Sequence, residues 1–145
     1  MLSRIGHALP LTVHEPFTVR WSVDRTAGLT PRIRNGERIF VGPGRTVCLE
    51  AFGVPADGGA EGAIAMMTDG APVERDGDLT EHDGEVLRHA FWVTTEVKGR
   101  IQYELYGWAA TPEEVAGVIC MYDDPADLSW AQETWRSLRH RPRNT

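Results

Sequence analysis

Seven acidic side chains lie close together between residues 68 and 85, in a segment that also contains three evenly spaced Asp-Gly pairs. The acids are Asp69, Glu74, Asp76, Asp78, Glu81, Asp83 and Glu85. Carboxylates at short spacing suit calcium, but an EF-hand loop starting at Asp76 needs glycine at its sixth position and glutamate at its twelfth, where Glu81 and Leu87 stand. We therefore interpret the Asp-Gly pairs as tight turns in a solvated segment. A weak calcium site built from Asp76, Asp78 and Asp83 stays open as an alternative.

Residues capable of transition-metal or nucleophilic chemistry are scattered along the chain. None of the five histidines has the HxH, HxxH or HExxH spacing of a local metal site. No serine stands in a G-x-S-x-G motif, and no Walker A or G-x-G-x-x-G loop is present. We interpret Cys48 and Cys120 as buried, reduced thiols. The sequence thus predicts no catalytic residue, no metal and no cofactor, and it favours a protein that is not an enzyme.

One arrangement leaves a different chemistry open. His89 shares a strand face with Leu87, Phe91 and Val93, where a buried, hydrogen-bonded histidine is the common outcome. In a barrel or sandwich with a cavity, however, His89 could lie near Tyr103 and Glu104 of the next strand. Together these three residues would form a small-molecule or catalytic pocket with acid-base groups.

Aromatic and arginine side chains give candidates for contact with a partner. Several aromatic residues alternate out of phase with the presumed core of their strands, and either a helix covers them or they form a recognition surface. The C-terminal helix is expected to have one narrow apolar stripe, formed by Leu128, Ala131, Trp135 and Leu138, and Trp130 lies about 120° away from the centre of that stripe. Aromatic residues and arginine are enriched in interfaces. The candidate partner-binding residues are Trp92, Tyr106, Trp108, Trp130, Arg136 and Arg139.

Composition indicates one globular domain over residues 1–145. The chain is 41% apolar and 25% charged, and its net charge of −6 argues against general binding of nucleic acid. The basic tail 139–145 runs against that balance, and we interpret it as a solubilising tail or a protein contact. No apolar stretch approaches the length of a membrane span, and the first residues contain no apolar run of signal-peptide length, so we expect a cytoplasmic protein.

Alternation of apolar and polar residues is the dominant local pattern, and it predicts strands. It is clearest over 16–24, 45–52, 85–97 and 101–109, and the apolar run 63–68 indicates a further, central strand. Thr111, Pro112 and Glu114 have the spacing of a helix N-cap and predict one helical turn. Asp124 and Pro125 predict the start of a C-terminal helix over about 125–140. We therefore expect a mainly β protein, an antiparallel sandwich of about seven or eight strands with one C-terminal helix, or alternatively a small β-barrel.

Three stretches are similar to those of immunoglobulin-like domains and of bacterial PKD-type domains. They read "GPGRTVCLEAF", "AIAMMTDGAPVE" and "HAFWVTTEVKGRIQYELYGWAA", and the likeness covers about residues 37–122. The chain departs from the antibody pattern because Cys120 falls one strand later than the usual second cysteine. The resemblance implies an immunoglobulin-like sandwich. By elimination of the chemistries above, we predict a non-enzymatic protein-binding or assembly module, a structural component of a larger complex or an oligomer.

Overall fold

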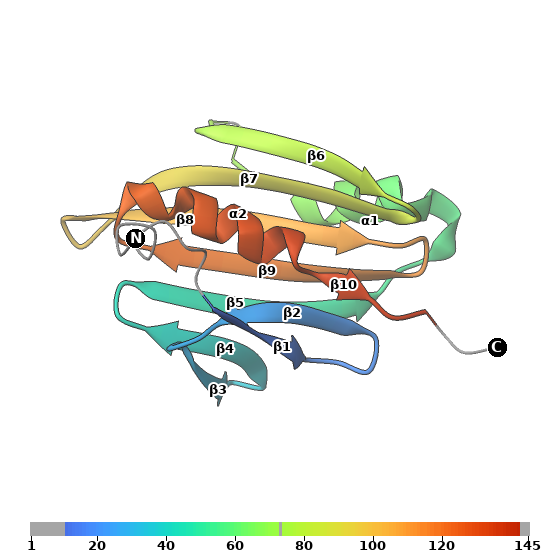
Figure 1. The fold of residues 1–145 in the computed structure, drawn as a ribbon. Helices are drawn as coiled ribbons and strands as arrows, with labels where there is room; N and C mark the ends of the chain where they lie inside the picture. The colour runs from blue at the N-terminus through green and yellow to red at the C-terminus, as the bar shows by residue number, and fades with distance from the viewer. Residues whose placement is uncertain (1–10, 73, 143–145) are drawn as a thin grey trace, which may run out of the picture.

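The computed structural model describes residues 11–72 and 74–142, and it is mainly β (Figure 1). This confirms the predicted fold class of antiparallel sheets with a C-terminal helix, in an open, sandwich-like arrangement. The described part of the chain contains ten strands, more than expected. The strands are β1 (Thr12–Pro16), β2 (Trp21–Thr26), β3 (Thr30–Arg34), β4 (Glu37–Gly42), β5 (Arg45–Gly53), β6 (Gly77–Asp83), β7 (Val86–Val97), β8 (Arg100–Ala110), β9 (Glu114–Tyr122) and β10 (Arg139–His140). The α-helices are α1 (Gly59–Thr68) and α2 (Leu128–Arg136), and short 3-10 turns, Ala56–Gly58 and Pro125–Asp127, precede them.

The strands form two sheets in which every neighbouring pair is antiparallel. The larger sheet has the order β3-β4-β5-β9-β8-β7-β6, and the smaller one has the order β1-β2-β10. The two longest strands, β7 and β8, pair along their whole length from Leu87 opposite Ala110 to Val97 opposite Arg100, as the alternation predicts. Most neighbours in the large sheet are consecutive in sequence, but β5 pairs with β9 across more than sixty residues.

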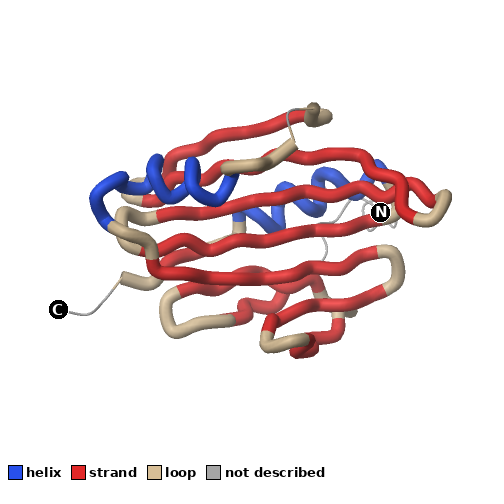
Figure 2. The backbone as a smooth tube through the Cα atoms, turned by 180° about the vertical axis from the view of Figure 1, so that it is seen from behind, coloured by secondary structure: helices blue, strands red, loops and turns tan. Residues whose placement is uncertain are grey.

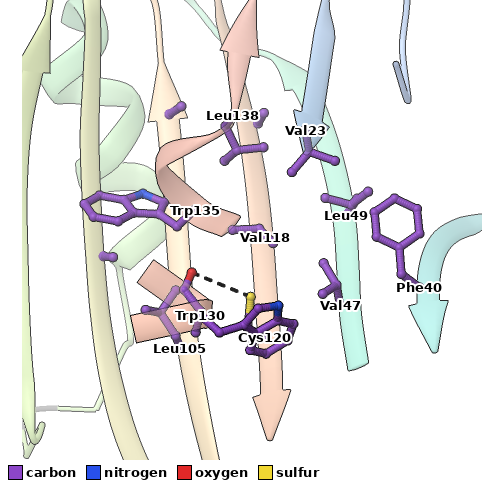
Figure 3. Packing of buried hydrophobic residues seen from close by; sticks show 14 of the residues in the cluster. Val23, Phe40, Val47, Leu49, Leu105, Val118, Cys120, Trp130, Trp135 and Leu138 are labelled. Carbon is purple, nitrogen blue, oxygen red and sulfur yellow. Dashed lines mark hydrogen bonds between the residues drawn. The ribbon is translucent and has the colours of Figure 1, made fainter. Parts of the chain in front are cut away.

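The main core lies between the large sheet on one side and α2 with the small sheet on the other (Figures 1 and 3). Trp135 is fully buried there, and its indole N–H donates to the Trp108 carbonyl at 3.0 Å. The Asp24 N–H of β2 donates to the Ser137 hydroxyl at 2.9 Å, which ties the small sheet to the end of α2. The apolar side of α2 and this hydrogen bond therefore join the large sheet to the small sheet.

Helix α1 covers part of the opposite face of the large sheet, so the large sheet is flanked by helices on both sides (Figure 2). The segment 63–68, predicted as a central strand, instead lies in this helix. Ala60, Ala63 and Ile64 are buried at a three-to-four-residue spacing against Phe91 and Trp108. A short apolar run is compatible with a buried strand or a buried helix, and the helix-forming alanines and methionines agree with the second outcome.

The C-terminal helix begins as predicted but ends earlier. The Asp124 carboxylate accepts from the Ala126 N–H at 2.9 Å, and Pro125 occupies the first helical position. The helix ends at Arg136 rather than near residue 140, because the chain turns back and residues 139–140 pair with β2 as strand β10. The predicted basic tail 139–145 therefore starts within a sheet, and its residues 143–145 lie outside the described part of the chain.

The three Asp-Gly pairs of the acidic segment have three different roles. Gly84 has a φ of 62° in the hairpin between β6 and β7, as the turn prediction requires, and Gly70 has a φ of 78° just after α1. Gly77 instead begins β6, where a Cβ atom would lie 2.4 Å from the ring of Trp92. Glycine is needed there for close packing and not for a turn.

Candidate functional site

Two adjoining cavities, which we call together the Val19 groove, open beside the turn between β1 and β2. Their volumes are about 230 and 270 Å³, and both are lined by the turn residues Thr18, Val19, Arg20 and Trp21. On one side the groove continues to β10 and on the other to the end of β5. The first cavity is also lined by His14, Pro16, Ser22, Arg139, His140 and Arg141, and the second by Ala51, Phe52, Gly53 and Glu114.

A compact hydrogen-bonded turn holds Val19 at the rim of this groove. The Thr18 hydroxyl accepts from the Arg20 N–H at 3.2 Å and from the Trp21 N–H at 3.0 Å, and the Phe17 N–H donates to the Trp21 carbonyl. Threonine side chains stabilise turns in this way. Val19 is 89% exposed as a result, whereas Phe17 packs partly against the core. The strand predicted over 16–24 is interrupted here, and Val19 does not share the buried face of Trp21.

A hydrogen-bonded contact between the Glu114 carboxylate and the His140 ring forms the junction of the two cavities. The Glu114 carboxylate lies 2.6 Å from His140 Nε2, and its other oxygen lies 3.8 Å from Arg20 Nε. Both side chains are largely buried. The ring of His140 also lies against that of Trp21, with 4.8 Å between the ring centroids. This pair joins β9 to β10 and so fixes the last described strand across the groove.

Glu114 takes this position because the segment that precedes it forms a turn and not the predicted helix. The Thr111 hydroxyl accepts from the N–H groups of Glu113 and Glu114, at 3.3 and 3.1 Å, and the Thr111 N–H donates to the Glu114 carbonyl. The spacing read as a helix N-cap thus caps the tight connection between β8 and β9. A threonine hydroxyl accepts such backbone hydrogen bonds both at the start of a helix and in a turn. The Thr-Pro-x-Glu spacing is therefore not specific to helices.

An ion pair between Arg139 and Asp24 lies at the outer wall of the groove. Arg139 Nη1 donates to the Asp24 carboxylate at 3.0 Å, and His14 Nδ1 lies 4.0 Å from the same oxygen. Arg139 is 58% exposed at its side chain, so more than half of that side chain is open to solvent. It is the member of the predicted contact set that lies in this groove.

The aromatic candidates for partner contact lie elsewhere, and two of them are buried. Trp108 is 7% exposed beneath α1, and Trp130 is 7% exposed with its indole N–H donating to the Thr26 hydroxyl at 2.8 Å. In this structure neither presents its side chain to a partner. Trp92 and Tyr106 are half-buried on opposite faces of the large sheet, against the core and the α1 cluster respectively. The sequence left open whether a helix covers these aromatic residues or whether they form a recognition surface. In the structure, both helices contribute to covering them.

Arg136 is engaged within the chain. Its guanidinium lies 2.9 Å from Glu81 of β6 and 3.2 Å from Glu133 of the same helix, and it also stands over the ring of Trp135. These contacts place it on the surface between α2 and β6, away from the Val19 groove.

The pocket expected near His89, Tyr103 and Glu104 does not form from those three residues. Successive residues of a strand point to opposite faces, so Tyr103 and Glu104 cannot share one. Tyr103 stacks on Tyr122 on the α2 side, with 5.8 Å between ring centroids. His89 lies on the other face, where its Nδ1 is 2.9 Å from the Thr80 hydroxyl and burial lowers its pKa.

The acidic residues weighed as a calcium site are also separated. Asp76 and Asp83 stand at the two ends of the extended strand β6, which places them about 20 Å apart at 3.3 Å per residue. The Asp76 carboxylate accepts from the Thr94 hydroxyl at 2.6 Å, while Asp83 pairs with Arg88. Within the described residues no group of three potential ligands converges on a metal position.

The two cysteines are unpaired, and their surroundings disfavour the reactive thiolate. Cys120 is fully buried and Cys48 is half-buried, and burial raises the pKa of both thiols. The prediction of a buried thiol is therefore met by Cys120 and only partly by Cys48.

Comparison with known proteins gives a structural likeness only. No family model matches the chain, and no curated protein is similar to it. The crystal structure of a protein from Bacteroides thetaiotaomicron VPI-5482 has a similar fold, with a TM-score of 0.65 at 13% identity over 84% of this chain. The similar region is 45% of that protein, so the chain spans less than half of its length. At this identity the likeness shows the fold alone.

Apart from Arg139, the residues that line the groove were missed by sequence reasoning. Arg20 and Val19 were assigned to a continuous strand, Glu114 to a helical turn, and His140 to the end of the C-terminal helix. The only available signal was the cluster of basic residues around 136–143, which indicated a contact but not its position.

Within the part of the chain that the structure describes, no helix is long and apolar enough to cross a membrane.

Proposed function

We propose that this chain is a protein-binding or assembly module, a component of a larger complex, and that the Val19 groove is its contact surface. The observation that carries the proposal is the exposure of Val19, which is 89%, on a turn held by side chain and backbone hydrogen bonds between two cavities. Phe52, which is 47% exposed, lies across the second cavity. Apolar side chains held rigidly at a concave surface are typical of binding sites.

The partner is another protein or a second copy of this chain. The net charge of −6 opposes a nucleic-acid partner, because a continuous polyanion would be repelled outside the groove. Among the residues selected from sequence, Arg139 supports the proposal through its place in the groove. The cytoplasmic location, the immunoglobulin-like resemblance and the lack of enzymatic activity stay predictions of the sequence.

The alternative function, a small-molecule or catalytic pocket, has less support. Its three residues lie on two faces of the large sheet, so they offer no shared pocket for acid-base catalysis. Glu114 and His140 are hydrogen-bonded to each other and link β9 to β10, which is a structural arrangement.

A position-specific crosslinking experiment tests the proposed function. A photo-reactive phenylalanine analogue replaces Val19 in the full chain, expressed in its own cells, and matched chains carry it at Ile33 or Ile101, which are 71% and 52% exposed on other surfaces. We expect a discrete adduct from position 19 alone, and a weaker one when Phe52→Ser is added.

The mass of the adduct separates the two kinds of partner, since a second copy gives twice the mass of the chain. Native mass measured over a range of concentrations must then agree. An equal yield of adducts at all three positions, or none at position 19, would contradict the groove as a contact surface.

A further inference from the structure

We propose that the Val19 groove recognises a short acidic segment of its partner, with carboxylates in the half beside β10 and an apolar side chain against Phe52. This inference rests on the proposed function and adds the chemistry of the ligand. Basic side chains provide half of the ten residues that line the first cavity, and none of the ten is acidic. These basic residues are His14, Arg20, Arg139, His140 and Arg141.

The nearby carboxylates leave much of this positive charge available. Glu114 is shared between His140 and Arg20, and the 3.8 Å to Arg20 Nε is longer than a hydrogen bond. Asp24 takes one N–H of Arg139 and leaves the rest of that guanidinium toward solvent. With the histidines neutral, three arginines face two carboxylates, which gives the groove a net positive charge in a chain of net charge −6.

Arg141 is the residue best placed to bind an incoming carboxylate. Its backbone N–H donates to the Arg20 carbonyl at 2.7 Å, which fixes the chain at the groove, and its side chain is exposed. Among the described residues it forms no ion pair. A guanidinium with free N–H groups binds a carboxylate through two parallel hydrogen bonds.

The second cavity has a larger share of apolar residues in its lining than the first. Its wall is formed by Val19, Ala51 and Phe52, and its acidic residue, Glu114, is turned toward His140. The ligand must therefore carry negative charge at one end and an apolar side chain at the other. This pairing of charged and apolar contacts is available in a peptide segment.

Size and charge together favour a peptide segment over other anions. The two cavities, of about 230 and 270 Å³, each hold a few side chains, so an extended segment can occupy both. A nucleic acid would need a long basic track to neutralise successive phosphates, and the groove provides a single cluster. An acidic segment places its charge only where the arginines stand.

The test uses an acetylated, amidated hexapeptide, Glu-Asp-Glu-Gly-Leu-Gly, and its uncharged counterpart, Gln-Asn-Gln-Gly-Leu-Gly. Each is added to the isotope-labelled full chain, and backbone amide shifts are followed by NMR. We expect shifts confined to residues around 18–22, 51–53 and 139–141, with binding at least about tenfold weaker for the neutral peptide. Raising the salt concentration from about 0.05 to 0.5 M should weaken binding of the acidic peptide only.

Matched arginine variants locate the charge. We expect Arg139→Gln with Arg141→Gln to weaken binding of the acidic peptide at least about fivefold, whereas Arg32→Gln with Arg34→Gln on the exposed edge strand β3 leaves it unchanged. Equal binding of both peptides, shifts outside the groove, or no shifts up to about 5 mM peptide would overturn the inference. If crosslinking at position 19 succeeds in that case, the protein-binding function stands and the acidic ligand alone fails.

Discussion

Glu50 is a carboxylate that the fold places in an unfavourable environment. It lies on β5 opposite Gly117 of β9, where a Cβ atom on the glycine would be 3.0 Å from the Glu50 side chain. Burial raises the pKa of Glu50, and the negative charge of Glu37 raises it further. Among the described residues no cation pairs with it, so folding stabilises its protonated form relative to the charged form.

This environment predicts that stability falls as pH rises through the range of Glu50 titration. Because the folded pKa lies above the unfolded value, the favourable contribution is fully present below the unfolded pKa and is lost as pH passes the folded one. We therefore expect Glu50→Gln to melt at a slightly higher temperature than the unsubstituted chain at pH 7, with the difference disappearing near about pH 4.

Thermal denaturation at the two pH values measures this effect. Glu85→Gln, in the exposed turn between β6 and β7, serves as the control and should leave the melting temperature unchanged at both. A lower melting temperature for Glu50→Gln at pH 7 would mean that the carboxylate makes a favourable contact and that burial does not dominate.

At the scale of elements, the closest approach in the main core is between β8 and α2. A Cβ atom on Gly107 would lie 2.3 Å from Cδ1 of Trp135, whose side chain is fully buried. Neither element can shift easily, because the Trp135 indole is also bonded to the Trp108 carbonyl. The glycine thus sets the distance between the helix and the large sheet.

We expect Gly107→Ala to lower the free energy of unfolding by about 1–3 kcal/mol, because the added methyl group displaces a close-packed tryptophan. The matched control is Gly62→Ala in α1, where nothing lies within 4 Å of the new Cβ. That change should raise stability by about 0.5–1 kcal/mol, since alanine restricts the unfolded chain. Urea denaturation measures the free energy of unfolding of both variants. Equal changes in the two variants would show that the β8–α2 contact accommodates an added methyl group.

At the scale of the molecule, Arg88 joins segments that are far apart in sequence. It is 6% exposed on β7, and its Nη2 donates to the Leu138 carbonyl at 2.6 Å, where the chain passes from α2 to β10. Its Nη1 lies 3.2 Å from Asp83, whose side chain is 76% exposed. The arginine therefore anchors the C-terminal segment, and with it the groove, to the large sheet.

Arg88→Met should destabilise the fold by about 1–3 kcal/mol, because it leaves the buried Leu138 carbonyl without its donor. Asp83→Asn removes only the exposed partner and should cost less than about 1 kcal/mol. Chemical denaturation of the two variants checks the difference. If Asp83→Asn proved as damaging as Arg88→Met, the salt bridge and not the carbonyl contact would be the important bond.

Local patterns were sufficient for the elements whose character depends on neighbouring residues. The alternation over residues 86–109 predicted β7 and β8, because the face of each strand residue is set by its position in the chain. Asp124 and Pro125 predicted the start of the C-terminal helix, since a capping carboxylate and a proline act within one turn. The mainly β fold class followed from the same local evidence.

Only the tertiary structure decided which faces meet and which distant residues share a site. Burial of Trp108 and Trp130 depends on two helices packing on opposite faces of one sheet, and the run over 63–68 fits either a helix or a strand until its partners are known. The groove unites Val19, Phe52, Glu114 and His140 through strand pairings that span most of the chain. Such long-range pairing is selected by the total burial of the folded chain, and no short stretch of sequence carries that information.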